Sequence, residues 1–178
     1  DGVPVLRRCT AGGCVLQGPG CLNFALAVPL AAWPELGHLH ASYAILLGRI
    51  AAALAARGTP ARPAGISDLA LDGCKISGNA QRRLRRAILH HGTLLHRPDY
   101  DGMDRYLLEP EDRPDYRGAR THRAFVRAVP LDSAALRQAL REAFGATDPP
   151  ESPTPEESAA ASALAQSKYR SPEWTHRR

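Results

Sequence analysis

The sequence predicts an α/β or α+β domain in which a mixed, largely antiparallel sheet is flanked by helices. Extended segments come first, one amphipathic helix follows, and further strands then precede the helices at the C-terminal end. Short glycine turns separate successive strands, which favours a sheet whose neighbouring strands run in opposite directions. Because 178 residues suffice for one core of ordinary size, we expect a single domain over residues 1–178.

Three extended segments are expected before the first helix. They are Val3–Leu6, Cys14–Gln17 and Leu22–Val28, with glycine loops between them and Pro29 at the end. The chain begins at Asp1, and the strand expected at Val3–Leu6 starts almost at once. We therefore expect the domain to be incomplete at its N-terminus, with any targeting signal missing as well.

The middle of the chain predicts one helix and a hairpin. Apolar residues recur three and four positions apart over His40–Arg57, and Gly58 follows as a cap. Strands are expected at Leu69–Leu71 and Lys75–Ser77, joined by Asp72-Gly73, a dipeptide typical of two-residue hairpin turns.

A further strand and two helices follow. Gly78–Ala80 predicts a bend, the basic run Arg82–Arg86 follows it, and Ile88–Leu95 predicts a strand. Helices are expected over Asp99–Leu107 and Ser133–Phe144.

The C-terminal part predicts a linker and a last short helix. Asp132 is expected to cap the preceding helix and Gly145 to end it. Residues 148–155 form a proline-rich acidic linker, and Thr154–Glu157 reads as a capping box that opens the last helix.

The composition is that of a folded, water-soluble protein. Hydrophobic residues make up 44% and charged residues 23%, and no apolar run approaches the roughly 20 residues that a membrane-spanning helix needs. The four cysteines lack the Cys/His spacing typical of zinc sites. We expect a cytoplasmic protein with reduced thiols and no membrane contact.

Arginine has almost replaced lysine in this chain. Lysine and arginine together number 23, yet only Lys75 and Lys168 are lysines. Where a general positive charge suffices the sequence uses arginine, so these two positions are candidates for sites that require a compact ammonium group.

The segment around Lys75 is the most informative for chemistry. A lysine on a strand that runs into Ser77-Gly78-Asn79 brings together an ammonium, a hydroxyl, an amide and backbone N–H groups. This set suits a carboxylate or a phosphate. Asp68, one strand away, could hold Mg²⁺ or a ribose, whereas histidines such as His90 on a buried strand are more often core residues than catalysts.

The first loop carries complementary features. Between Arg7 and Gly13 lie two guanidinium groups and consecutive small residues whose N–H groups could line an anion site. No Walker A pattern is present.

At these positions the sequence resembles the lipoate-protein ligases and octanoyltransferases. The matching segments are Arg7-Arg8-Cys9-Thr10-Ala11-Gly12-Gly13, Gly73-Cys74-Lys75-Ile76-Ser77-Gly78-Asn79-Ala80, His91-Gly92-Thr93-Leu94-Leu95 and Lys168-Tyr169-Arg170-Ser171-Pro172-Glu173-Trp174. They resemble the family's arginine and glycine loop, its lysine motif, its histidine-glycine-threonine strand and its closing tail. Ala11 replaces a loop glycine, and Gln17 stands where many members have histidine.

The resemblance implies the fold of the biotin/lipoate ligase catalytic domain and a lipoate-protein ligase activity. In that reaction lipoate is activated with MgATP to lipoyl-AMP and transferred to a lysine of a lipoyl-domain protein. Lys75 would be catalytic, bridging the acyl carbonyl and the α-phosphate, and Asp68 would lie near the metal. The residues implied in substrate or nucleotide binding are Arg7, Arg8, Thr10, Gly12, Gly13, Ser77, Gly78, Asn79, Ala80, His91, Gly92 and Thr93.

Two alternatives within the same fold remain open. An octanoyltransferase would need no ATP but would need a cysteine nucleophile facing the lysine. Cys74 is adjacent to Lys75, and neighbouring side chains on a strand point to opposite faces. No cysteine lies between Ala25 and Leu71 or after Leu95, the two stretches in which related transferases keep their thiol. The second alternative is a lipoyl-binding protein that has lost catalysis.

Nucleic-acid binding is an alternative function of a different class from the enzymes above. The net charge is +5 and Arg82–Arg86 is basic, but aromatic residues are only 6% and none lies among these arginines to stack on bases. We expect no nucleic-acid partner, and a basic rim could instead steer acidic lipoyl domains to the site.

Overall fold

The computed structural model describes residues 1–177 as two compact units. The larger unit spans Gly12–Thr147, and the smaller one combines Asp1–Ala11 with the chain from Asp148 onward. No helix among residues 1–177 is long and apolar enough to cross a membrane.

The larger unit contains one five-stranded sheet. Its strands are β1 (Cys21–Pro29), β2 (Arg62–Ala64), β3 (Asp68–Leu71), β4 (Cys74–Arg83) and β5 (Ala87–Leu95). They lie in the order β1-β5-β4-β3-β2, and each neighbouring pair is antiparallel. The expected fold class, a largely antiparallel sheet with flanking helices, is confirmed.

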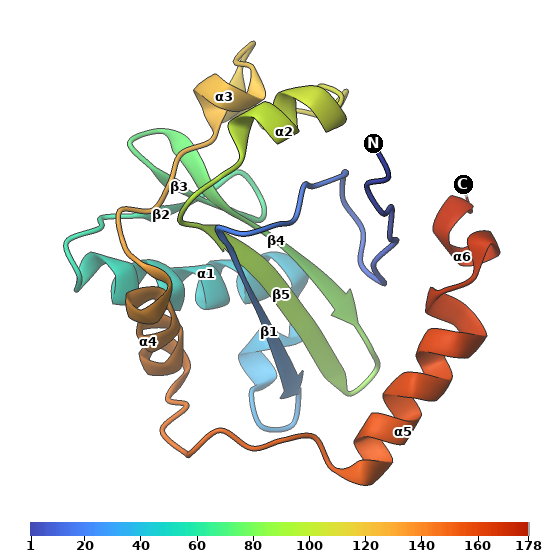
Figure 1. Cartoon of the computed structure of the whole chain (residues 1–178). Coiled ribbons are helices and arrows are strands. Elements are labelled where there is room, and N and C mark those ends of the chain that lie inside the picture. Colours follow the sequence, from blue (N-terminus) through green and yellow to red (C-terminus); the bar gives the residue numbers. More distant parts are fainter. Residues whose placement is uncertain (178) are drawn as a thin grey trace. The chain divides into compact units, whose positions relative to one another are not determined.

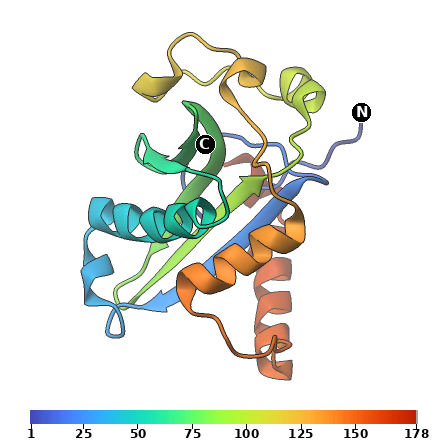
Figure 2. The ribbon, with the colours of Figure 1, turned by 90° about the vertical axis from the view of Figure 1, so that its left-hand side faces the viewer.

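The helices of this unit are α1 (Leu39–Ala55), α2 (Tyr100–Tyr106), α3 (His122–Phe125) and α4 (Ser133–Phe144), with the short turns η1 (Pro34–Gly37) and η2 (Asp115–Arg117). Figures 1 and 2 show α1 and α4 side by side on one face of the sheet. We call this side the helix face.

The core lies between the helix face and these two helices. The apolar positions that predicted the first helix are its buried ones, including Leu47, Ile50 and Leu54. They pack on strand residues such as Leu69 and Ile76. Burial of such aliphatic side chains stabilises the fold by about 1.5–3 kcal/mol each.

Local signals fixed several boundaries correctly. The Asp132 side chain accepts a hydrogen bond from the Ala135 N–H, and Gly145 ends α4 in the left-handed conformation at φ +63°. Asp72 and Gly73 both have positive φ, 49° and 73°, as the hairpin turn between β3 and β4 requires.

Two expected strands are absent from the described structure. Val3–Leu6 and Cys14–Gln17 have no regular secondary structure, so these predictions are wrong. The side chains of Val5, Leu6 and Val15 are exposed. Strand-like composition alone does not make a strand when no apolar face is buried against a partner.

The expected bend at Gly78–Ala80 is also wrong, because β4 continues without interruption to Arg83. Asn79 explains this continuity. Its backbone N–H and its side-chain amide both donate to the carbonyl of Ser67, and it pairs with Gly92 on β5. Tertiary pairing overrides the turn tendency of Gly-Asn.

The smaller unit holds the C-terminal helices α5 (Pro155–Leu164) and α6 (Pro172–His176) and the π-helical turn η3 (Ala165–Tyr169). The capping box between Thr154 and Glu157 is confirmed, since each side chain bonds to the backbone of the other residue. Residues 148–154 have no regular secondary structure.

The N-terminal segment is tied to α6 within this unit. The Trp174 indole N–H donates to the carbonyl of Arg7 (2.8 Å), and Arg7 Nε donates to the carbonyl of Thr175 (3.0 Å). The Lys168 ammonium lies 4.5 Å from the centre of the Trp174 ring and 5.3 Å from that of Tyr169. The second lysine singled out by composition therefore makes a cation–π contact.

Candidate active site

A β-bulge at the start of β4 decides which way Lys75 points. Ser77 pairs with Leu69 and Lys75 pairs with Ala70, so Ile76 is an extra residue without a partner on β3. A bulge interrupts the alternation of side chains along a strand. Ile76 packs into the core on the helix face, while Lys75 lies on the opposite face with Gly78 and Asp68, which we call the lysine face.

Lys75 is held by an ion pair. Its Nζ lies 2.7 Å from Asp68 Oδ1, and Asp68 is nearly buried, with a side-chain exposure of 9% against 29% for Lys75. A largely buried pair of this kind is screened by water much less than a surface pair. The ammonium is therefore fixed in place and still reachable from solvent.

Gly78 provides the room in which the lysine side chain lies. A Cβ at position 78 would be 3.0 Å from Lys75 Cε and 3.1 Å from Nζ. Any other residue at position 78 would push against the lysine side chain.

Tyr116 completes the surroundings of Asp68. Its hydroxyl donates to Asp68 Oδ2 at 2.8 Å, so each carboxylate oxygen has one partner. Burial, followed by the charge of Asp68, raises the pKa of Tyr116 far above its usual value. Tyr116 is consequently a hydrogen-bond donor across the physiological pH range.

The remaining motif residues on β4 and β5 divide between the two faces. Thr93 and His91 pair with Gly78 and Ala80 respectively, and directly opposed residues share a face. The lysine face therefore carries His91, Thr93 and Ala80. The Thr93 hydroxyl donates to Asn23 Oδ1 at 2.6 Å and accepts from Gln17 Nε2 at 3.2 Å.

Ser77, Asn79 and Gly92 lie on the helix face. Ser77 is fully buried and pairs with Leu94 of the core, and its hydroxyl accepts from the Asn79 amide at 3.2 Å. The structure therefore does not bring the Ser77 hydroxyl and the Asn79 amide to the Lys75 ammonium, and their binding roles stay predictions.

His90 is a core residue, as expected for a histidine on a buried strand. It is fully buried, its ring lies near those of Phe24 and Tyr43, and Nδ1 is 3.2 Å from the Gln81 amide nitrogen. Burial, together with the nearby His91, lowers the pKa of His90 to about 4. His90 is neutral at pH 7 and packs the sheet against α1.

The arginine loop belongs to the smaller unit up to Ala11. Within it, Arg8 donates to the Thr10 hydroxyl (3.1 Å) and to the carbonyl of Ala11 (2.7 Å). These bonds curl the loop around one guanidinium group. Gly12 and Gly13 belong to the larger unit, and a joint site formed by this loop and Lys75 stays a prediction.

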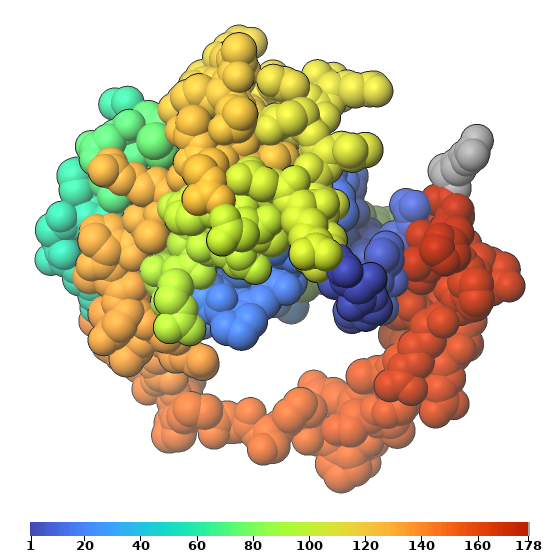
Figure 3. All heavy atoms as spheres, turned by 45° about the horizontal axis from the view of Figure 1, so that its top comes forward, coloured from blue at the N-terminus to red at the C-terminus, as the bar shows by residue number. Residues whose placement is uncertain are grey.

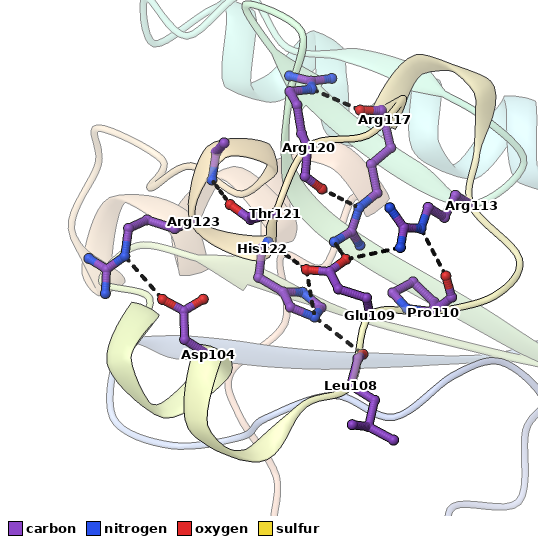
Figure 4. A network of polar contacts seen from close by, with 11 residues as sticks. Asp104, Leu108, Glu109, Pro110, Arg113, Arg117, Arg120, Thr121, His122 and Arg123 are labelled. Atoms are coloured by element: carbon purple, nitrogen blue, oxygen red, sulfur yellow. Dashed lines mark hydrogen bonds and ion pairs between the residues drawn. The ribbon is translucent and has the colours of Figure 1, made fainter.

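No motif or periodic pattern in the sequence marks the segment after α2 that carries Tyr116, the partner of Asp68. A polar network centred on Glu109 organises it, as Figure 4 shows. Glu109 pairs with Arg117, which is almost completely buried, and also accepts from the backbone N–H of His122 (3.2 Å). Figure 3 shows the yellow and orange atoms of this part of the chain packed into one continuous layer.

This segment also contacts Lys75 through the backbone. Lys75 forms a parallel bridge with Val126, and the Arg127 N–H donates to the carbonyl of Lys75 at 2.9 Å. Neither Tyr116 nor Arg127 stands in a periodic pattern or a motif, so only the three-dimensional arrangement reveals their connection to Lys75.

The expected metal-binding role concerns Asp68. Among residues 1–177 no group of three His, Cys, Asp or Glu side chains could hold a metal ion. Both Asp68 oxygens are engaged, one by Lys75 and one by Tyr116. The metal-binding role of Asp68 stays a prediction.

Comparison with known proteins identifies the family of the chain. The family model for the lipoyl protein ligase A/B catalytic domain matches residues 1–144. Lipoate-protein ligase LplJ of Bacillus subtilis is 30% identical over 126 residues, which are 71% of this chain and 37% of that protein. Lipoate-protein ligase 1 of Staphylococcus aureus is 27% identical over 184 residues, 99% of this chain and 55% of that protein. The chain thus spans about half or less of the length of these relatives.

Solved structures show the same fold. The bipartite lipoate protein ligase of Thermoplasma acidophilum, studied with its E2 lipoyl domain, matches with a TM-score of 0.79 and 27% identity over 96% of this chain and 69% of its own. A lipoate-protein ligase A bound with ATP has a TM-score of 0.80 and 23% identity over 98% of this chain and 72% of its own. A motif lysine on the sheet, a matching catalytic-domain model and this shared fold lead to one conclusion: the chain belongs to the lipoyl protein ligase A/B catalytic domain family.

Proposed function

We propose that the chain activates lipoate with ATP to lipoyl-AMP and transfers the lipoyl group to a lysine of a lipoyl-domain protein. The observation that carries this proposal is Lys75, whose ammonium is fixed by Asp68 on the lysine face and lies against a glycine. The ATP-bound neighbour and the neighbour studied with its E2 lipoyl domain support the two substrates.

The first step is attack of the lipoate carboxylate on the α-phosphorus of ATP. A new oxygen–phosphorus bond forms, the bond to the pyrophosphate oxygen breaks, and pyrophosphate leaves. Negative charge from two reactants meets in the transition state, so a fixed compact cation between them lowers the barrier more than it stabilises the separated substrates. Lys75 is the group that supplies this charge.

The second step makes the amide bond. The amine of an acceptor lysine attacks the acyl carbon, AMP leaves with the electrons of the broken bond, and the amine proton is released to solvent. Lys75 can stay beside the carbonyl oxygen and stabilise the charge that develops there.

Arginine at position 75 would not perform this role. Its guanidinium group is planar and wider than an ammonium, and a Cβ-sized addition above Gly78 would already touch the lysine side chain. Magnesium would arrive bound to the ATP phosphates, as Mg²⁺ usually does.

An ATP-independent octanoyltransferase is the second candidate. Cys9, Cys14, Cys21 and Cys74 are all free thiols, so none is withdrawn from chemistry by a disulfide. The Cys74 sulfur lies 3.9 Å from Arg120 Nη1 and 3.9 Å from the carbonyl of Ala124, whereas Lys75 lies against Asp68. The sulfur of Cys74 thus contacts Arg120 and Ala124 rather than the Lys75 ammonium, which favours the ligase.

The test supplies lipoate and ATP to the chain and measures exchange of labelled pyrophosphate into ATP, then the mass of an added apo lipoyl domain. We expect exchange only when lipoate is present, and addition of one lipoyl group to the acceptor. Transfer from octanoyl carrier protein without ATP would establish the transferase instead, and binding of lipoate without either reaction would establish a protein without catalysis.

A further inference from the structure

Asp68 connects Lys75 to a residue that no motif of the sequence includes. Lys75 Nζ contacts Oδ1 at 2.7 Å, and the Tyr116 hydroxyl contacts Oδ2 at 2.8 Å. Since a carboxylate can turn about its Cβ–Cγ bond, a donor on one oxygen decides where the other oxygen points. The direction in which Asp68 holds the ammonium therefore depends on Tyr116.

Tyr116 is itself held from two sides. Its ring packs against that of Phe125, with centroids 5.0 Å apart. On the other side the backbone at Gly65 lies close to the Tyr116 ring, since a Cβ at position 65 would be 3.6 Å from Tyr116 Cε1. The positive φ of Gly65, 54°, favours glycine there as well.

The loop that carries Tyr116 is fixed by the Glu109 network. Arg117, the next residue, pairs with Glu109 and places its guanidinium 4.9 Å from the centre of the Phe125 ring. Arg120 donates to the carbonyl of Tyr116. Figure 4 shows Arg117, Arg113 and His122 converging on the Glu109 carboxylate. These contacts hold η2, the turn that carries Tyr116, in place.

We propose that Tyr116 is a positioning residue for Lys75. It occupies Oδ2 of Asp68 and leaves Oδ1 to accept from the ammonium. This inference rests on the proposed function, because it assigns Tyr116 to the activation step. A hydrogen bond to a charged group is stronger than one between neutral groups, so its loss affects the geometry of the pair.

The kinetic test is Tyr116→Phe, which removes the hydroxyl and keeps the ring on Phe125. We expect kcat for lipoate-dependent pyrophosphate exchange to fall about tenfold to a hundredfold. The KM values for lipoate and ATP should stay within about threefold, since the proposal gives Tyr116 a role in positioning Lys75 and none in substrate binding. Tyr100→Phe makes the same chemical change on α2, away from Asp68, and should leave both parameters unchanged.

A double variant separates positioning from a general structural effect. If Tyr116 acts through Asp68, the losses in kcat of Tyr116→Phe and Asp68→Asn should not multiply in the double variant. Fully multiplicative losses, or an unchanged kcat in Tyr116→Phe, would overturn the proposal.

A spectroscopic readout decides the question without activity. The chain has two lysines, so labelling with ε-¹³C-lysine gives one signal for Lys75 and one for Lys168. Tyr116→Phe should move the Lys75 signal toward its position in Asp68→Asn and leave the Lys168 signal in place. An unmoved Lys75 signal would refute the positioning role even in a fully active protein. If the parent chain shows no exchange, the proposed function fails while this signal still reports on Tyr116.

Discussion

Asn79 and Gly92 face each other across β4 and β5 more closely than any side chain at position 92 would allow. A Cβ on Gly92 would lie 1.9 Å from Asn79 Oδ1 and 2.8 Å from Phe24 Cζ. The Asn79 amide is held at the same time by the Ser67 carbonyl and the Ser77 hydroxyl. The asparagine of one motif and the glycine of the next are therefore a packing pair.

This contact predicts that Gly92→Ala destabilises the sheet. Insertion of a methyl group into a packed contact costs about 1–3 kcal/mol, and here the neighbour is a side chain already fixed by two hydrogen bonds. The free energy of unfolding in urea should fall by that amount. Gly48→Ala on α1 is the matched control, because a Cβ there would meet no atom within 4 Å and alanine favours a helix. Equal stability of Gly92→Ala and the parent would contradict the packing pair.

His90 predicts a loss of stability in mild acid. Its pKa is about 4 in the folded protein against 6.5 for the unperturbed side chain, so between these values the unfolded chain binds more protons than the folded one. The free energy of unfolding should fall as the pH drops from 6.5 to 4, by about 3 kcal/mol from this residue.

The measurement is urea unfolding over this pH range for the parent and for His90→Gln, which cannot titrate. The variant should lose the part of the pH dependence that His90 contributes, whatever its stability at pH 7. Parallel curves for the two proteins would show that His90 is not buried in its neutral form.

The hydrogen bond from the Trp174 indole to the Arg7 carbonyl should hold the C-terminal tail in place within the smaller unit. Trp174→Phe keeps an aromatic ring for Lys168 and removes the N–H that donates to Arg7. A single hydrogen bond of this kind contributes about 0.5–1.5 kcal/mol. Amide hydrogen exchange in peptides that contain Arg7 or Thr175 should accelerate, whereas Trp33→Phe should leave those peptides unchanged. Identical exchange in the Trp174→Phe variant would show that the tail does not depend on this bond.

The sequence predicted those parts of the fold whose signals are local. The buried face of α1, the caps of α4 and the Asp72-Gly73 turn follow from spacing and from residue type. The strand predicted over Val3–Leu6 was wrong, because a strand needs a partner strand and composition does not show whether one is present. The bend at Gly78–Ala80 was wrong because Asn79 is held by Ser67 and β5.

For the site, the lysine motif could be identified but not its geometry. The bulge at Ile76 places Lys75 and Ser77 on different faces of the sheet, and strict alternation would have placed them together. Tyr116 lies 48 positions from Asp68 in the chain, and no periodicity joins two such residues. Their contact depends on tertiary packing of the segment after α2.

The cysteines predict the type of intermediate. If lipoyl-AMP is formed, a quadruple variant with serine at Cys9, Cys14, Cys21 and Cys74 should keep ATP-dependent transfer, with small packing losses because none of the four is buried. A thioester route requires one thiolate as nucleophile. Loss of all transfer in one well-folded Cys→Ser variant, with ATP-independent transfer by the parent, would contradict the ligase.

The most direct test of the account is lipoate-dependent exchange of pyrophosphate into ATP by Lys75→Arg, compared with Lys75→Ala and with Lys168→Arg. The ammonium at position 75 is fixed by Asp68 above Gly78, and removal of such a preorganised charge costs about 3–4 kcal/mol in the barrier. We predict that both Lys75 variants lose exchange by a factor of a few hundred or more while they still bind lipoate, and that Lys168→Arg retains exchange. Substantial exchange by Lys75→Arg would contradict the central claim that a compact ammonium at this position carries the activation step.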